Sequence, residues 1–126
     1  MKLSFPRAGL LVTAGLMFFF SCKKTDITAP VITMISPTEG QLLTGGQTVN
    51  IKATAVDETG IHMVHIAVTD ASTGFHIMHV EEHFDGKTYN YNQTFTVQAG
   101  KTYKIEIDAA DHANNITTKE LSVSAN

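Results

Sequence analysis

Short runs that alternate apolar and polar residues fill the sequence after Pro30. Successive strand residues point to opposite faces of a sheet, so this pattern predicts strands with one buried face. Clusters of Gly, Asp and Asn between the runs predict turns. Beyond Ser21 no segment keeps a helical apolar period. Seven such runs in a segment of about 100 residues predict an all-β fold, an antiparallel sandwich of two layers. The expected strands are residues 31–36, 48–56, 61–70, 75–83, 88–97, 101–110 and 115–124.

The N-terminal segment, residues 1–21, has the layout of a secretory signal peptide. Lys2 and Arg7 form a basic start, and an apolar run follows from Ala8 to Phe20. This run is shorter than the roughly 20 residues that a membrane-spanning helix needs. Small Ser21 then precedes the only cysteine, Cys22. A single cysteine cannot form an internal disulfide, so Cys22 is either free or modified.

The pair Ser21-Cys22 after the apolar run resembles the lipobox of bacterial lipoproteins. Phe19 and Phe20 depart from the usual Leu and small residue, which the lipoproteins of Bacteroidota tolerate. The resemblance implies cleavage before Cys22, acylation of its thiol, and the membrane as a partner through the lipid. The protein would then lie on the outer membrane, at the cell surface or facing the periplasm. The alternative is an ordinary secreted protein with an unmodified cysteine.

Loss of residues 1–21 would leave a mildly acidic protein. It would remove two of the nine basic residues and no acid, so the formal net charge would change from −3 to −5. We expect no nucleic-acid partner, because the sequence has no basic stripe. Residues 22–29 would form a tether, and residues 30–126 a single domain of common size.

The segment "GKTYKIEIDAADHANN", residues 100–115, resembles the sixth strand of fibronectin type III, cadherin and bacterial Ig-like domains. "APVITMISPTEG" and "AVDETGI" are similar to the first strand and second loop of bacterial Ig-like repeats. The resemblance implies a seven-stranded Ig-like sandwich in which the Tyr103 hydroxyl binds nearby backbone. It also implies a binding or structural module that is not an enzyme. An antibody-type domain is excluded, because the chain has no Trp and no cysteine pair.

The segment "GFHIMHVEEHFDG", residues 74–86, is rich in histidine. On a helix, His76, His79 and His83 would share one face, whereas a strand would separate His76 from the other two. The turns at either end leave only residues 75–85 between them, which favours a strand. The segment is therefore expected to form the second arm of a hairpin with residues 61–70. Pairing of Asp70 near Gly74 would set His65 opposite His79.

This hairpin is a candidate zinc site. His65 and His79 would bind one Zn²⁺ ion, and Glu81 or Glu106 would supply a third ligand. His83 is a further candidate ligand. The alternative is that these histidines are ordinary surface residues. No role is assigned to the remaining histidines, which are His62, His76 and His112.

A second candidate metal site uses oxygen ligands. In a seven-stranded sandwich the chain start, the second loop and the last loop meet at one pole. Cadherins bind Ca²⁺ at the corresponding pole, and carboxylate and amide oxygens suit this ion. The alternative is that Asp and Asn occur here because they favour turns. The candidate ligands are Asp26, Asp57, Glu58, Asp111, Asn114 and Asn115.

Apart from Zn²⁺ or Ca²⁺ we expect no cofactor, and the remaining hypothesis is recognition of a protein or a glycan. Met63, Phe75 and Ile77 are expected beside the histidines on the non-core face of the hairpin, where exposed apolar side chains mark an interaction surface. Alternatively, a loop or a partner subunit covers them. Tyr89 and Tyr91 are expected in the core, and would form a sugar platform only if their strand faced the other way.

Catalysis has little support in the sequence. It has no Gly-x-Ser-x-Gly elbow, phosphate-binding loop or His-Glu-x-x-His motif. We therefore predict that the protein is not an enzyme. A metallohydrolase would need residues 74–86 to be helical.

Overall fold

The computed structural model describes residues 22–126, and the predicted signal peptide lies outside them. Within the described residues the structure contains no helix long and apolar enough to cross a membrane. The strands are β1 (Val31–Ser36), β2 (Gln41–Leu43), β3 (Thr48–Asp70), β4 (His76–Thr96), β5 (Thr102–Asp111) and β6 (Ile116–Ala125).

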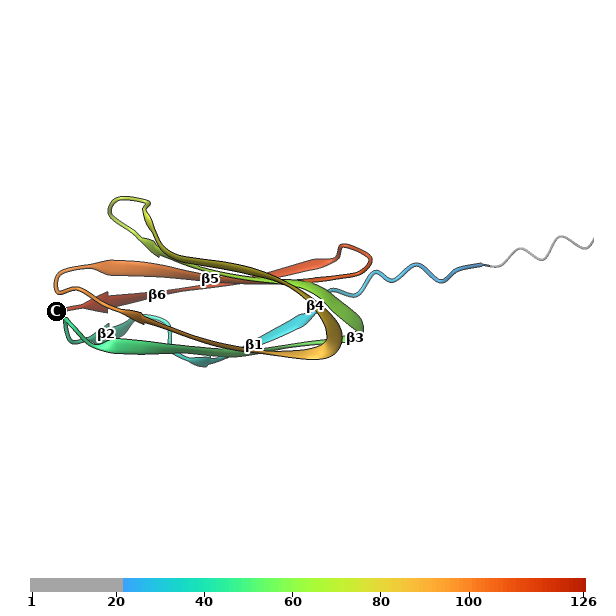
Figure 1. Ribbon diagram of the computed structural model, residues 1–126, viewed down its shortest axis with the longest axis horizontal. Helices are drawn as coiled ribbons and strands as arrows, with labels where there is room; N and C mark the ends of the chain where they lie inside the picture. Colours follow the sequence, from blue (N-terminus) through green and yellow to red (C-terminus); the bar gives the residue numbers. More distant parts are fainter. Residues whose placement is uncertain (1–21) are drawn as a thin grey trace, which may run out of the picture.

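The strands form two layers, which Figure 1 shows one above the other. In the β1 layer, β1 and the later half of β4 pair with the first half of β3. In the β5 layer, the second half of β3 lies between the first half of β4 and β5, and β6 follows β5. β2 pairs in parallel with β6 at the edge. Because β3 and β4 each belong to both layers, they join the layers at one end of the molecule.

The predicted sandwich is confirmed, with two differences in its strands. Residues 48–56 and 61–70 run together as β3, and residues 75–83 and 88–97 run together as β4. The sheet bends at these joins without ending, and the β3–β4 register shifts between Val56 and Ile61. β2 was not predicted, because a strand this short cannot show an alternation. Its parallel pairing with β6 also makes the sandwich not wholly antiparallel.

The core lies between the layers and follows the predicted alternation. In β5, Ile105 and Ile107 are fully buried, whereas Glu106 and Asp108 are partly exposed. Each such isoleucine contributes about 1.5–3 kcal/mol relative to an exposed one. The same alternation forces the side chains of Glu106 and Asp108 onto the outer side of the β5 layer.

The tyrosines lie as expected. Tyr91 and Tyr103 are buried, and Tyr89 packs against the core with part of its surface exposed. The Tyr103 hydroxyl accepts a hydrogen bond of 2.9 Å from the main-chain N–H of Gln98. This is the backbone contact that the resemblance implied for Tyr103.

The predicted register of the β3–β4 hairpin is wrong by two positions. The main-chain N–H of Asp70 donates to the carbonyl of Phe75, so the turn is wider than pairing with Gly74 would make it. His65 therefore lies opposite Glu81 and not opposite His79. A shift of two positions leaves every side chain on its expected face.

Candidate functional site

The outer side of the β5 layer carries a hollow of about 350 Å³, which we call the outer-face hollow. Side chains from three neighbouring strands and from β6 line it, because outward-facing residues of paired strands lie side by side. The tip of the β3–β4 hairpin curves away from β5 on this side (Figure 1). The lining includes Met63, His65, Glu81, Glu106, Asp108, Ile116 and Thr118.

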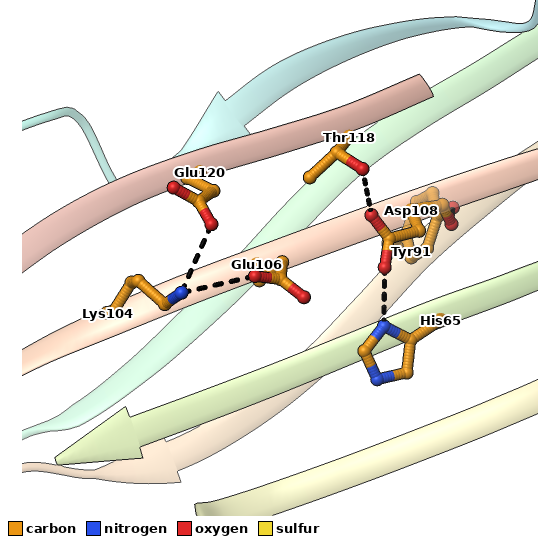
Figure 2. Close-up of polar contacts among 7 residues, drawn as sticks. All are labelled: His65, Tyr91, Lys104, Glu106, Asp108, Thr118 and Glu120. Atoms are coloured by element: carbon orange, nitrogen blue, oxygen red, sulfur yellow. Dashed lines mark hydrogen bonds and ion pairs between the residues drawn. The ribbon is translucent and has the colours of Figure 1, made fainter. Parts of the chain in front are cut away.

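Two residues that line the hollow, His65 and Asp108, form a hydrogen-bonded pair (Figure 2). The two residues are directly opposite in the β3–β5 register, and His65 Nδ1 lies 2.7 Å from Asp108 Oδ2. The Thr118 hydroxyl donates to the other carboxylate oxygen. Of the two tautomers of a neutral imidazole, a carboxylate that accepts from Nδ1 favours the one with the proton on that nitrogen. Nε2 of His65 then keeps a free lone pair for a ligand.

The core supports Asp108 from the other side. The Tyr91 hydroxyl donates a hydrogen bond of 2.6 Å to the main-chain carbonyl of Asp108. Burial first, and then the nearby Tyr89 and Asp108, raise the pKa of the Tyr91 hydroxyl above its ordinary value. The hydroxyl therefore stays a donor at neutral pH, and Asp108 is held at its backbone as well as at its carboxylate.

Charged residues border the hollow along β5 and β6. Lys104 Nζ lies 3.1 Å from a Glu120 oxygen and 3.2 Å from a Glu106 oxygen (Figure 2). Hydrogen bonds to Glu120 and then to Glu106 raise the pKa of Lys104. The Glu106 carboxylate thus faces Lys104 on one side and the hollow on the other.

The predicted zinc ligands are brought together only in part. His65 and Glu106 do lie together, and with Asp108 they offer ligand atoms within 4.8 Å of one another. The ring centre of His79 lies 4.8 Å from that of His65, and Glu81 lines the same hollow. His83 does not join this group. It lies opposite Met63, and its ring centre is 5.2 Å from that of His62.

Asp108 is the residue of this site that the sequence reasoning missed. The alternation in β5 places Asp108 and Glu106 on one face, but only the β3–β5 register sets Asp108 against His65. That register depends on an extra residue near Ile61, where the pairing of β3 shifts. The alternation alone gives no signal for this shift.

The predicted calcium ligands meet at the end of the sandwich where the chain enters. Asp26, Asp57 and Asp111 offer carboxylate oxygens within 4.8 Å of one another, and the latter two residues are buried. The side-chain amide of Asn115 donates to Asp111 and to the main-chain carbonyl of Asp26. Glu58 is exposed and is not part of this group.

Hydrogen-bond donors stabilise these carboxylates. The Thr59 hydroxyl lies 2.6 Å from Asp26 and 2.7 Å from Asp57. The bond from Thr59, followed by one from the main-chain N–H of Thr28, lowers the pKa of Asp26. None of the ion pairs formed within residues 22–126 includes any of the three carboxylates.

The predicted interaction residues lie on the outer side of the hairpin. Phe75 is 71% exposed and Ile77 is 45% exposed, while Met63 is half-buried at the hollow. Ile116, 54% exposed, adds apolar surface on the β6 side. Apolar and ionisable groups therefore share one face.

Comparison with known protein families shows which family the chain belongs to. A family model described as a bacterial Ig domain matches residues 30–107, which is more than half of the chain. The chain belongs to the bacterial Ig domain family. The match covers β1 to β4 and most of β5, so it includes His65 and Glu106.

A solved structure of fibronectin(III)-like modules shares the fold of this bacterial Ig domain. The fibronectin(III)-like modules of Clostridium thermocellum CbhA match 79% of this chain and 47% of theirs, with a TM-score of 0.50 and 21% identity. The sporulation control protein Spo0M of Bacillus subtilis matches 79% of this chain and 51% of its own, with a TM-score of 0.46 and 11% identity. The chain thus spans about half the length of these two structures. The comparison with curated proteins found no match.

Proposed function

We propose that the protein is a non-catalytic bacterial Ig module, held on the cell-envelope membrane by acylated Cys22, that binds a protein or a glycan. The observation that carries this proposal is the outer face of the β5 layer. That face carries a hollow of about 350 Å³, and the hairpin that extends from it carries the exposed side chains of Phe75 and Ile77. Exposed apolar side chains on the same face as a mostly apolar hollow with a few polar groups are typical of an interaction site.

The arrangement of the chain suits a tethered module. Cys22 is exposed, and the segment after it leaves the sandwich at the end opposite the tip of the β3–β4 hairpin (Figure 1). A lipid on Cys22 would therefore leave Phe75 among the residues farthest from the membrane. Acylation by more than one chain would make the anchoring stable.

The hydrogen bonds of the outer face support a binding role over catalysis by an activated hydroxyl group. The Thr118 hydroxyl donates to Asp108 and not to His65, so these three residues do not form a nucleophile activated by a base. Domains of the Ig-like and fibronectin III-like kinds are typically binding or structural modules. Binding is therefore the role that we assign to this face.

Binding assays with envelope components test this proposal. Purified residues 22–126 are assayed by interferometry against envelope polysaccharides and envelope protein fractions. The double variant Phe75→Ser, Ile77→Ser is expected to bind its ligand at least tenfold more weakly, because it removes the exposed apolar contacts. Val31→Ser is the matched control, because Val31 is an apolar residue of the β1 layer whose exposure, 65%, lies between those of Ile77 and Phe75. Equal binding by the double variant and the wild type would contradict the proposal.

Metal binding is a second candidate function, favoured by two groups of ligand atoms. His65, Glu106 and Asp108 suit Zn²⁺, whereas Asp26, Asp57 and Asp111 suit Ca²⁺. At a hundredfold excess over the dissociation constant, either ion would stabilise the fold by about 2.7 kcal/mol. Thermal unfolding with each ion measures this. If His65→Ala is no longer stabilised by Zn²⁺, or Asp111→Asn is no longer stabilised by Ca²⁺, the corresponding group of residues is the metal site. No change in the unfolding temperature of the wild type with either ion would contradict metal binding as a function.

A further inference from the structure

All six histidines of the chain lie on β3, on β4 or just after β5, in two separate groups. His65, His76 and His79 border the outer-face hollow or the hairpin beside it. The other group, which we call the corner histidines, consists of His62, His83 and His112. It lies where β3 and β4 bend between the layers, and neither site described above uses His62 or His112.

A β-bulge places His62 between its two partners. Ile61 pairs with Asp111 and Met63 with Ala110, so His62 is an extra residue relative to β5. The β3–β4 register also shifts between Ile61 and Met63. Such bulges redirect a side chain out of the regular alternation. β4 and β5 flank β3, so His83 and His112 approach His62 from opposite sides.

Two ring separations, from His62 to His83 and from His62 to His112, match those of neighbouring ligands on one metal ion. The ring centre of His62 lies 5.2 Å from that of His83 and 4.8 Å from that of His112. A Zn–N bond of about 2.0–2.1 Å puts each ring centre roughly 3.2 Å from the ion, so tetrahedral neighbours have ring centres about 5 Å apart. The rings are tilted by 54° and 41°, so they are not stacked flat on each other.

An acidic side chain completes the group. Asp85 Oδ1 lies 3.6 Å from His112 Nε2, close to the roughly 3.4 Å that separates two ligand atoms on a tetrahedral zinc ion. The side chain of Asp85 is 96% exposed and that of His112 is 52% exposed. Both can therefore rotate about their side-chain bonds to close around an ion without any movement of the core.

We infer that the corner histidines and Asp85 form a binding site for a divalent transition-metal ion of the kind that prefers imidazole, such as Zn²⁺. Three imidazole nitrogens select such an ion over Ca²⁺ or Mg²⁺, which prefer oxygen. The site shares no ligand with the outer-face hollow, so the inference does not rest on the proposed binding function. The inference makes His83 a ligand of this site together with His62 and His112.

Zinc titration of the full chain, purified in detergent without a histidine tag, tests this inference. Isothermal titration calorimetry of the wild type is compared with His62→Ala, which removes the central ligand. We expect His62→Ala to bind zinc at least tenfold more weakly at this site, with unchanged thermal unfolding in the absence of metal. The matched control is His76→Ala, an exposed histidine of the other group, and it should bind as the wild type does. Unchanged affinity in His62→Ala would overturn the inference.

Nuclear magnetic resonance of the histidine rings gives a second, independent readout. On addition of Zn²⁺ the ring signals of His62, His83 and His112 should shift together at equal metal concentration. The result should persist in His65→Ala, which removes the candidate zinc ligand of the outer-face hollow. Shifts confined to His65 and His79 would overturn the inference and leave the proposed function untouched.

Discussion

Asp108 connects the core to the outer face at the scale of single residues. Its main-chain carbonyl accepts a hydrogen bond from buried Tyr91, while its carboxylate accepts from His65 and Thr118. The position of His65 therefore depends on core packing as well as on its own strand. A ligand that binds in the hollow meets an imidazole whose orientation is set in advance.

The Tyr103 hydroxyl should contribute measurably to stability. Tyr103→Phe leaves the main-chain N–H of Gln98 without its 2.9 Å partner, and we expect a loss of about 1–2 kcal/mol in the free energy of unfolding. Urea denaturation measures this loss. Tyr89→Phe is the matched control, because its hydroxyl donates to the exposed Glu82 carboxylate. An equal loss in the two variants would contradict this role for Tyr103.

The ion pair between Asp70 and Lys101 should make stability depend on pH. A hydrogen bond from Lys101, followed by bonds from Ser72, holds the pKa of Asp70 well below its ordinary value. The stabilisation that this ion pair contributes is therefore complete above about pH 4, which is near the pKa of an aspartate in the unfolded chain. It is lost as the pH falls toward the lower pKa of Asp70 in the folded protein.

Asp70→Asn tests this dependence. We expect the difference in unfolding free energy between wild type and variant to stay constant between pH 7 and 5 and to shrink below about pH 4. Urea denaturation across this range measures it. A difference that persists unchanged down to pH 2 would contradict the assignment.

At the scale of elements, β5 and the first arm of β4 differ in what they stabilise. Ile107 is fully buried in β5, whereas Ile77 on β4 is 45% exposed. Ile107→Ala should cost about 2–5 kcal/mol of unfolding free energy, because it leaves a cavity in the core. Ile77→Ala should change stability by less than about 1 kcal/mol. Chemical denaturation of both variants measures this, and a similar loss in both would contradict the layer assignment.

The sequence predicts which side of each strand is buried better than it predicts strand bounds or register. Alternation of apolar and polar residues predicts which side chains of β5 and of both hairpin arms face the core. Successive strand residues point to opposite faces of the sheet, and only one of these faces is buried. Alternation does not predict that residues 57–60 and 84–87 continue the strands, since a bend without a break has no signal of its own. It also leaves register open, because a shift of two positions keeps every face.

Register then decides which site residues are predicted. The sequence predicts that His65 and Glu106 lie on the outer face, because both face outward under any register that buries Ile66 and Ile107. Asp108 was not predicted as a partner of His65, and His83, which was expected near His65 and His79, lies beside His62. Both depend on the bulge beside Ile61, which sets Asp108 against His65 and turns His62 toward His83.

At the scale of the whole molecule, the lipid that we propose on Cys22 should decide where the protein resides. In cells that contain the wild type we expect incorporation of a labelled fatty acid and recovery in the membrane fraction. Cys22→Ser should remove the label and release the protein from membranes, because the variant lacks the thiol that we propose as the site of acylation. Labelling and fractionation measure both effects. The core does not include Cys22, so a change in unfolding is not expected, and membrane retention of unlabelled Cys22→Ser would contradict lipid anchoring.

The central claim is that the outer face of the β5 layer, at the hairpin, meets the ligand in the intact envelope. Photo-crosslinking in cells tests it most directly, with benzoylphenylalanine replacing Phe75 and, as the matched control, replacing Ile35 on the β1 layer. Both residues are well exposed, at 71% and 61%. We predict an adduct of discrete mass from position 75 and none from position 35. The same adduct from both positions, or an adduct from position 35 alone, would contradict the account.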